Sequence, residues 1–301
     1  MQHSSQSPRS AREYAGLVLR GCCMGAADIV PGVSGGTMAF ILGIYEELVD
    51  SIRTVGRPAF FRPLLHGRLL AAFHAINGMF LIAIGAGIAL AVLTLSHALE
   101  YLLHTHPILI WSFFFGLVLA SVVVVAKRIP QWTLQLFLIG IFGAIFAYVL
   151  VGLVPVQTPN APWFLVLSGA IAICAMILPG ISGSFLLVLL GKYEFVLRAV
   201  NERDLVSVGY IGIGAAAGIV LFSQVLSWLL HRYHDLTVAF LTGLMLGSLR
   251  KIWPWKVGDA NVLPHMGSGS MPNQEFLVGI GLMLGGLLLV IVLDKYAAKK
   301  S

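Results

Sequence analysis

The sequence predicts an all-α, polytopic integral membrane protein built from two repeats of inverted topology. Three observations predict this class: the bulk composition, six apolar segments of spanning length, and a motif that occurs twice. Of the 301 residues, 58% are hydrophobic and 11% are charged, and the mean hydropathy is +0.91. A soluble domain carries about 25% charged residues. The polar surface is therefore too small to cover a globule, and lipid must solvate most of the fold.

A spanning helix needs roughly 20 apolar residues, and six segments have about that length. We expect these helices at residues 75–97, 107–126, 133–154, 205–230, 236–251 and 276–294. Two further apolar stretches, 15–50 and 163–198, are interrupted near the middle. Pieces of this length either enter the bilayer and turn back or cross it fully, and the inverted relation of the two halves holds in both cases. Each stretch is therefore expected to form a broken or re-entrant helical hairpin.

Both interruptions contain the same Pro-Gly-x-Ser-Gly motif. The first begins at Pro31 and the second at Pro179, and a Leu-Gly-x-Tyr-Glu sequence follows each motif at the same offset. A weaker match relates residues 113–121 to residues 240–248. Agreement at so many positions predicts a tandem duplication.

The duplication defines the expected domain organisation. An N-terminal tail (1–13) precedes a first repeat (14–157) and a second repeat (158–301), each consisting of one hairpin and three spanning helices. Because three is odd, the second hairpin starts on the opposite side of the membrane from the first. Inverted repeats with discontinuous helices are typical of secondary transporters, whose binding sites lie near the midplane. The Lys and Arg residues favour cytoplasmic N- and C-termini, since the expected outer loops 98–106 and 155–162 contain neither.

The motif is suited to binding an anion. A break in a membrane helix exposes backbone groups that cost several kcal/mol each if they stay unsatisfied in lipid. Glycines allow close approach of a ligand, and a helix N-terminus favours negative charge. The two half-helix starts are expected to meet at one central site; the alternative is that the glycines and prolines only kink and pack the helices. The candidate phosphate-binding residues are Gly32, Ser34, Gly35, Gly36, Thr37, Gly180, Ser182, Gly183 and Ser184.

Ionisable residues within apolar segments are costly and usually functional. Asp28 precedes the first motif and is expected either to carry a coupling proton or to form an ion pair with Arg20. Glu46 and Glu194 are matched by the repeat; they either bind a coupling cation, hold a basic residue near the substrate, or lie solvated at the interface. Coupling to H⁺ or Na⁺ is therefore a hypothesis.

Other chemistries are not supported by the sequence. It contains no Walker loop, dinucleotide fingerprint or HExxH motif, and its histidines lack metal-ligand spacing. The net charge of +6 comes from basic residues in short loops, where they contact lipid headgroups. We therefore expect no cofactor, no metal, no catalytic residue and no nucleic-acid partner.

The motifs also resemble a known family. The sequence GAADIVPGVSGGT at 25–37, with GIYE at 43–46 and LPGISGS at 178–184, is similar to the PopT-type polyprenyl-phosphate transporter family over residues 12–297. The resemblance implies a flippase in the bacterial cytoplasmic membrane whose lipid partner is undecaprenyl phosphate. That lipid is the carrier of cell-wall (peptidoglycan) and surface-polysaccharide synthesis. The alternatives are a transporter or channel for a small soluble anion, a membrane enzyme acting on a lipid phosphate, and a scaffold role.

Overall fold

The computed structural model describes residues 9–30, 33–156, 158–258, 260–263 and 274–298. It confirms the all-helical class, because the strands of the described residues are only β1 (Lys256–Val257) and β2 (Ala260–Asn261), which pair antiparallel. The first part of the chain forms α1 (Ala11–Ile29), α2 (Gly35–Ile41), α3 (Tyr45–Val55), α4 (Pro58–Leu65), α5 (Leu69–Ala75), α6 (Gly78–Thr105), α7 (Pro107–Ala126) and α8 (Leu134–Leu150). The second part forms α9 (Pro162–Ile177), α10 (Gly183–Leu189), α11 (Tyr193–Asn201), α12 (Leu205–Arg232), α13 (His234–Ser248) and α14 (Gln274–Ala298).

Among the described residues, four helices are long and apolar enough to cross a membrane. They are Gly78–Thr105, Pro107–Ala126, Leu205–Arg232 and Glu275–Lys295. The segments predicted at 133–154 and 236–251 are instead the 17-residue α8 and the 15-residue α13. At 1.5 Å per residue these helices are about 25 and 22 Å long, less than the hydrocarbon core of about 30 Å. Helix α13 is short because it packs inside the protein, where Val238, Leu244 and Met245 are fully buried.

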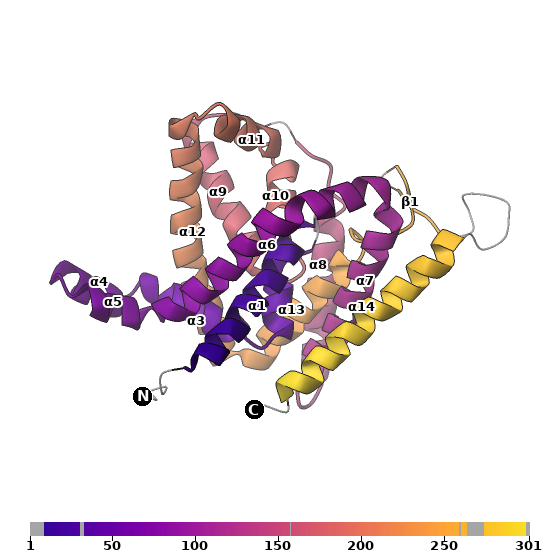
Figure 1. Ribbon diagram of the computed structural model, residues 1–301, viewed down its shortest axis with the longest axis horizontal. Coiled ribbons are helices and arrows are strands. Elements are labelled where there is room, and N and C mark those ends of the chain that lie inside the picture. The colour runs from indigo at the N-terminus through magenta and orange to yellow at the C-terminus, as the bar shows by residue number, and fades with distance from the viewer. Residues whose placement is uncertain (1–8, 31–32, 157, 259, 264–273, 299–301) are drawn as a thin grey trace.

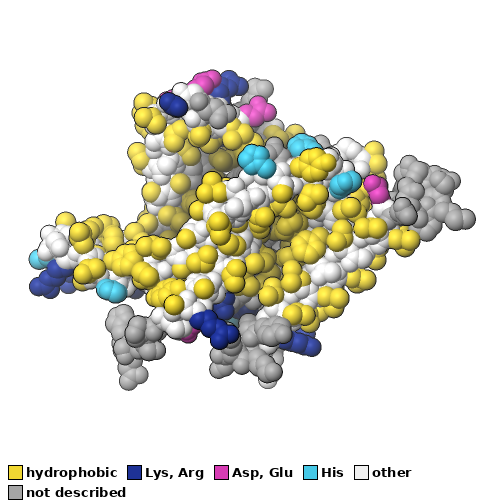
Figure 2. All heavy atoms as spheres, viewed as in Figure 1, with side chains coloured by type: hydrophobic (Ala, Val, Ile, Leu, Met, Phe, Trp, Pro, Cys, Tyr) yellow, Lys and Arg dark blue, Asp and Glu magenta, His cyan; other side chains and the backbone are white. Residues whose placement is uncertain are grey.

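The outer surface is apolar. Figure 2 shows hydrophobic side chains over the face formed by α6 and α14, with Lys and Arg atoms towards the ends of the molecule. Large hydrophobic residues on α8, such as Phe142 and Ile145, are more than half exposed. Such a surface is stable only against lipid. The structure therefore agrees with a multi-pass membrane protein.

Each broken hairpin contains three helices, not the two pieces expected. The second leg of 15–50 is divided into α2 and α3 by a turn at Gly43, and that of 163–198 into α10 and α11 by a turn at Gly191. Both glycines have positive φ, +70° and +63°, a conformation that other residues rarely adopt. Helices α2 and α10 have seven residues each, about 10 Å, so neither can cross the bilayer.

A projecting arm was not expected. Helices α4 and α5 extend away from the helical bundle (Figure 1). Leu65, Leu69 and Leu70 are 66–82% exposed on this arm, beside the exposed Arg62 and Arg68. Apolar and basic residues together are typical of a helix that lies in the membrane interface.

The helices associate in four long pairs. Helix α1 packs along α6 and α9 along α12, while α7 packs against α14 and α8 against α13. The start of α1 and the end of α14 lie at one end of the molecule, together with α3, whereas α11 lies at the other end (Figure 1). Two of these pairs join helices of the same half of the chain, α1 with α6 and α9 with α12, and the other two join helices of different halves.

Close helix packing depends on glycine at particular contacts. A Cβ at Gly214 of α12 would overlap the carbonyl oxygen of Val166 on α9, whereas a Cβ at Gly212 would meet nothing within 4 Å. Small residues at such positions let the backbones of membrane helices approach closely.

The Gly214→Val substitution is therefore expected to destabilise the fold by about 1–3 kcal/mol or more, the usual effect of overpacking. Thermal unfolding of the purified protein in detergent measures this as a lower midpoint. The matched control is Gly212→Val, which adds the same side chain on the same helix and should leave the midpoint nearly unchanged. Equal midpoints for the two variants would contradict the packing argument.

Candidate functional site

The two Pro-Gly-x-Ser-Gly motifs contact each other in the structure. The hydroxyl of Ser34 lies 3.2 Å from the carbonyl oxygen of Met176 and 3.1 Å from that of Leu178, directly before the second motif. In return, the amide of Gly180 donates to Oγ1 of Thr37 over 3.0 Å. We call this contact region the motif junction. The two breaks therefore meet, although they are separated by more than 140 residues of sequence.

The first motif satisfies its own amide groups. Ser34 caps α2 and accepts a hydrogen bond from the amide of Gly36 at 3.1 Å. The amide of Gly35 donates to Oδ1 of Asp28 at 2.7 Å. A carboxylate thus occupies the position at the helix start where the sequence predicted a ligand anion. In this conformation protein oxygens already accept from both amides, so binding of a phosphate at Gly35 and Gly36 stays a prediction that requires these bonds to open.

The second motif is arranged differently. Gly180 has φ +88°, and a Cβ there would lie 2.8 Å from Cα of Met245, so the break packs directly on α13. Ser182 is the N-cap of α10 but makes no capping hydrogen bond; its hydroxyl instead lies 2.8 Å from that of Ser184. Within the described part of the chain, the amide of Gly183 has no hydrogen-bond acceptor. This half of the junction retains unused donors.

The junction is shielded from solvent. Ser34 is 1% exposed, Thr37 is completely buried, and Ser182 is 6% exposed. Ser184 alone among these hydroxyl-bearing residues is partly exposed. Gly32, the remaining candidate residue, lies outside the described residues. Among the described hydroxyl-bearing residues of the junction, an anion can therefore approach Ser184 most readily.

The predicted pairing of Asp28 with Arg20 is not observed. Eight residues of helix separate them by about 12 Å, and Asp28 bonds to Gly35 instead. Arg20 lines a cavity of about 590 Å³ with Arg9, Arg12 and Glu13 on α1 and the residues before it. Arg9 forms an ion pair with Glu47 at 2.8 Å, and this hydrogen-bonded carboxylate raises the pKa of the Arg9 guanidinium.

Glu46 and Glu194 lie away from the motif junction. They belong to the first turns of α3 and α11, after the glycine turns. Glu46 has a half-exposed side chain, 3.4 Å from Nε2 of His234. Glu194 is exposed and has no ion-pair partner among the described residues. Their placement fits solvated residues better than a coupling site.

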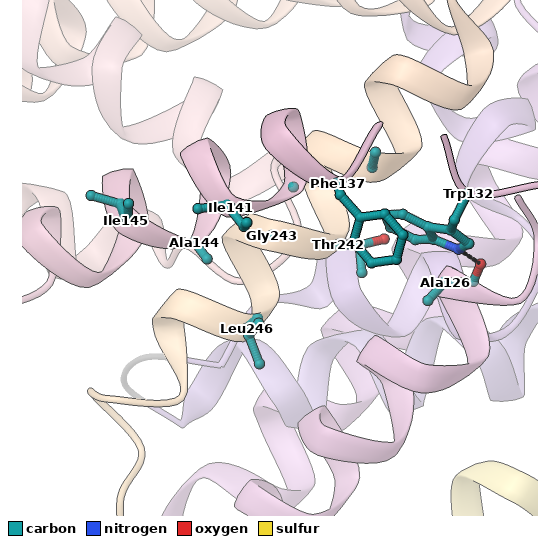
Figure 3. A pocket seen from close by; sticks show the side chains of 11 residues that line it. Ala126, Trp132, Phe137, Ile141, Ala144, Ile145, Thr242, Gly243 and Leu246 are labelled. Atoms are coloured by element: carbon teal, nitrogen blue, oxygen red, sulfur yellow. Dashed lines mark hydrogen bonds between the residues drawn. The ribbon is translucent and has the colours of Figure 1, made fainter. Parts of the chain in front are cut away.

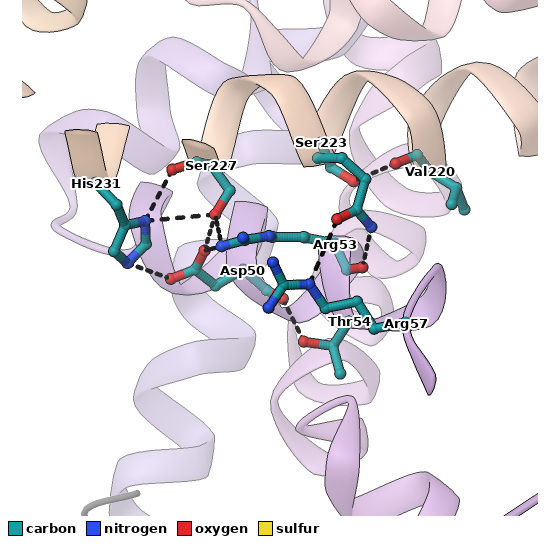
Figure 4. A network of polar contacts seen from close by, with 9 residues as sticks. Asp50, Arg53, Thr54, Arg57, Val220, Ser223, Ser227 and His231 are labelled. Carbon is teal, nitrogen blue, oxygen red and sulfur yellow. Dashed lines mark hydrogen bonds and ion pairs between the residues drawn. The ribbon is translucent and has the colours of Figure 1, made fainter. Parts of the chain in front are cut away.

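A polar network that the sequence did not predict joins α3 to α12 (Figure 4). Nη1 of Arg53 donates to the hydroxyl of Ser227 over 2.6 Å, and that hydroxyl also donates to Asp50. The second oxygen of Asp50 lies 3.4 Å from Nε2 of His231. The spacing of Asp50 and Arg53 on one helix face was a usable signal, but their partners lie more than 170 residues away. The network ties the first hairpin to the second half of the chain.

An apolar groove lies between α8 and α13 (Figure 3). Its volume is about 450 Å³, and its only hydroxyl among the described lining residues belongs to Thr242, which donates to the carbonyl of Val238. Trp132, at one end, donates to the carbonyl of Ala126 at 3.1 Å. The lining residues are Ala126, Trp132, Phe137, Gly140, Ile141, Ala144, Ile145, Ala239, Thr242, Gly243 and Leu246. The groove is suited to an aliphatic chain.

Broken helices that meet inside a bundle of apolar spanning helices define a multi-pass membrane protein. The chain belongs to the VCA0040-like family, described as undecaprenyl phosphate translocase-like, which it matches over residues 24–269. The family expected from the motifs is therefore confirmed.

Two curated relatives have the same name. A polyprenyl-phosphate transporter of Vibrio cholerae serotype O1 is 45% identical over 302 residues, which cover 95% of this chain and 98% of the relative. A polyprenyl-phosphate transporter of Staphylococcus aureus is 31% identical over 256 residues, which cover 79% of this chain and 85% of the relative. No solved structure matches the chain significantly.

Proposed function

We propose that this protein transports undecaprenyl phosphate across the bacterial cytoplasmic membrane and so returns the lipid carrier for cell-wall and surface-polysaccharide synthesis. Family membership supports the substrate class, since both relatives are named polyprenyl-phosphate transporters. The protein acts as a flippase and catalyses no covalent reaction. Its termini lie in the cytoplasm, the side that the Lys and Arg residues of the loops favour.

Alternating access follows from the proposed inverted repeat. The equivalent pairs are α1 with α9, α6 with α12, α7 with α13 and α8 with α14. Under that equivalence the contact of α1 with α6 corresponds to that of α9 with α12, and the contact of α7 with α14 to that of α13 with α8. Because the two halves make matching contacts, each half can adopt the conformation of the other. Such an exchange rocks one half against the other around a fixed site at the membrane midplane.

The observation that carries this proposal is the motif junction. Among the described residues, the broken helices are connected there by hydrogen bonds of Ser34 with the carbonyls of Met176 and Leu178 and of Gly180 with Thr37. The phosphate binds at this junction, first to Ser182, Gly183 and Ser184, whose donors are not used to cap α10. It engages the first motif only after Asp28 releases the amide of Gly35.

A vesicle assay tests the proposal. Purified protein is reconstituted into liposomes with undecaprenyl phosphate in both leaflets, and an external phosphatase reports the accessible fraction. With the protein present, the whole pool should become accessible; in protein-free vesicles, only the outer-leaflet pool should. If the reconstituted protein is folded and the inner-leaflet pool still stays inaccessible to the phosphatase, lipid transport is refuted. Uptake of inorganic phosphate by the same vesicles would support the alternative, a transporter of small soluble anions.

A further inference from the structure

The two short helices that follow the glycine turns, α3 and α11, are packed differently. Helix α3 packs on α12, which belongs to the other half of the chain. Helix α11 packs on α12 of its own half and makes no comparable contact with α6 among the described residues. Figure 1 shows α3 beside one end of α12 and α11 beside the other end. Of these two helices, only α3 therefore joins the two halves in this conformation.

The contact of α3 with α12 is polar (Figure 4). The guanidinium of Arg53 donates to the hydroxyl of Ser227, which donates to Asp50, and Nε2 of His231 lies 3.4 Å from Asp50. The side-chain amide of Gln224 donates to the carbonyl oxygen of Arg53 over 2.5 Å. We call this contact the α3 latch. Its groups are partly exposed, 41% for the side chain of Asp50 and 58% for that of His231, and exposed ion pairs contribute little stability. The latch can therefore open reversibly.

The helices of the latch have counterparts of matching geometry in the other half of the chain. Helices α6 and α12 both have 28 residues. The residue after each has nearly the same backbone angles, φ −135° and ψ 55° at His106 and φ −133° and ψ 49° at Tyr233. Helices α3 and α11 both begin with a tyrosine, two residues after a glycine of positive φ. If the halves are equivalent, the contact of α3 with α12 corresponds to a contact of α11 with α6.

The counterparts of the latch residues are unpaired in this conformation. Asp50 and Arg198 each lie five residues after the tyrosine that begins their helix. His231 and His104 are each the last residue but one of theirs. Arg198 and His104 are exposed, and neither forms an ion pair within the described part of the chain. The positions that are joined in the α3 latch are therefore free at the other end of the molecule.

The burial of the two hairpins follows the same division. Val49 on α3 is completely buried, whereas its counterpart on α11, Leu197, is 47% exposed. At the motif junction, Thr37 of the first hairpin is completely buried and Ser184 of the second is partly exposed. The hairpin that carries the α3 latch is thus covered, and the hairpin that carries α11 is open.

We propose that α11 and α6 form a second latch, which closes when the α3 latch opens, and that this exchange gates transport. The inference rests on the proposed function and names its two gates, α3 with α12 at the end of the chain termini and α11 with α6 at the opposite end. The Lys and Arg residues favour cytoplasmic termini. With that orientation, the present conformation is closed towards the cytoplasm and presents the motif junction to the outer leaflet.

Paired cysteines in the full-length protein, reconstituted in vesicles, test the second latch. The three native cysteines are first replaced by alanine. A short bifunctional thiol reagent should then link the pair Asp50→Cys/His231→Cys, whose native side chains are in contact in this conformation. It should also link the pair Arg198→Cys/His104→Cys, because the transporting protein visits both states. Each link should stop the translocation of undecaprenyl phosphate, since either one prevents the exchange.

The matched control is the pair Val200→Cys/His104→Cys. Val200 is 55% exposed on α11, and two residues of helix rotate the side-chain direction by about 200°, so Val200 lies on the face opposite Arg198 and should not be linked. The change Asp50→Ala weakens the α3 latch. It should raise the yield of the Arg198–His104 link at least about threefold, by shifting the population towards the second latch.

Three results would overturn the second latch. They are no Arg198–His104 link in folded protein whose Asp50–His231 pair is linked, an equal yield for the control pair, and a yield that Asp50→Ala leaves unchanged. If the Arg198→Cys/His104→Cys variant fails to fold, Arg198→Cys/His97→Cys serves instead with a longer reagent, because His97 is the counterpart of Gln224 in the latch. Linking is measured whether or not the lipid moves. Its failure is therefore distinct from failure of the proposed function, in which the wild-type protein does not move undecaprenyl phosphate in the vesicle assay.

Discussion

Replacing Ser182 and Ser184 together with alanine is expected to slow undecaprenyl phosphate transport at least about tenfold without destabilising the protein. Among the residues that the structure describes, these two hydroxyls bond only to each other, and Ser182 makes no capping bond to α10. Their removal therefore leaves no buried backbone group unpaired. If they donate to the phosphate, each loss removes a hydrogen bond to a charged group, which contributes about 1.5–3 kcal/mol.

The measurement is the rate of lipid translocation in vesicles, combined with the thermal unfolding midpoint. Ser34→Ala is the contrasting variant, because Ser34 caps α2 and bonds to the carbonyls of Met176 and Leu178. It should lower the unfolding midpoint, since loss of an N-cap alone costs about 1 kcal/mol. The bulky changes Ser34→Leu and Ser182→Leu should abolish transport altogether. A double alanine variant with the wild-type transport rate would remove the second motif from the phosphate site.

The sequence was most informative where chemistry is local. A proline followed by glycines favours a break in a membrane helix, and its recurrence at Pro31 and Pro179 predicted two equivalent breaks. The contact between Ser34 and Leu178 agrees with the expectation that the breaks meet. The sequence alone missed the additional turns at Gly43 and Gly191, because a Leu-Gly pair is common in spanning helices and only the backbone dihedrals reveal the positive φ.

Features that depend on tertiary position were harder to predict. Arg250 and Lys251 appear in the sequence as cations at a helix end, where extension to the lipid headgroups is the ordinary expectation. They form a pocket only because Tyr148, about 100 residues earlier, ends α8 beside them. Asp28 likewise lies eight residues from Arg20 in sequence, and its bond to Gly35 requires the chain to turn back at the break. Such partners are determined by the packing of helices, which periodicity does not encode.

Replacing Asp28 with asparagine is expected to separate substrate binding from transport. The carboxylate of Asp28 accepts from the amide of Gly35 at 2.7 Å and occupies the anion position of the first motif. An asparagine oxygen can accept the same hydrogen bond, so the closed conformation should persist. The substitution removes the negative charge of the carboxylate. In the wild type, the phosphate has to displace this charge, and protonation would neutralise it. We expect undecaprenyl phosphate to bind at least as tightly as in the wild type, while translocation slows at least about tenfold, a change equivalent to 1.4 kcal/mol in the barrier.

The pH dependence of translocation distinguishes a coupling role from a structural one. If protonation releases Asp28 from Gly35, the wild-type rate should respond to a pH gradient across the vesicle and the Asp28→Asn rate should not. Asp28→Ala is the second variant, because it removes the acceptor as well as the charge and leaves the amide of a buried helix start unpaired, a loss of about 1–3 kcal/mol. It should lower the unfolding midpoint, whereas Asp28→Asn should not. If the Asp28→Asn variant transports at the wild-type rate and with the wild-type response to pH, Asp28 is only a structural cap. The second motif alone then recognises the phosphate.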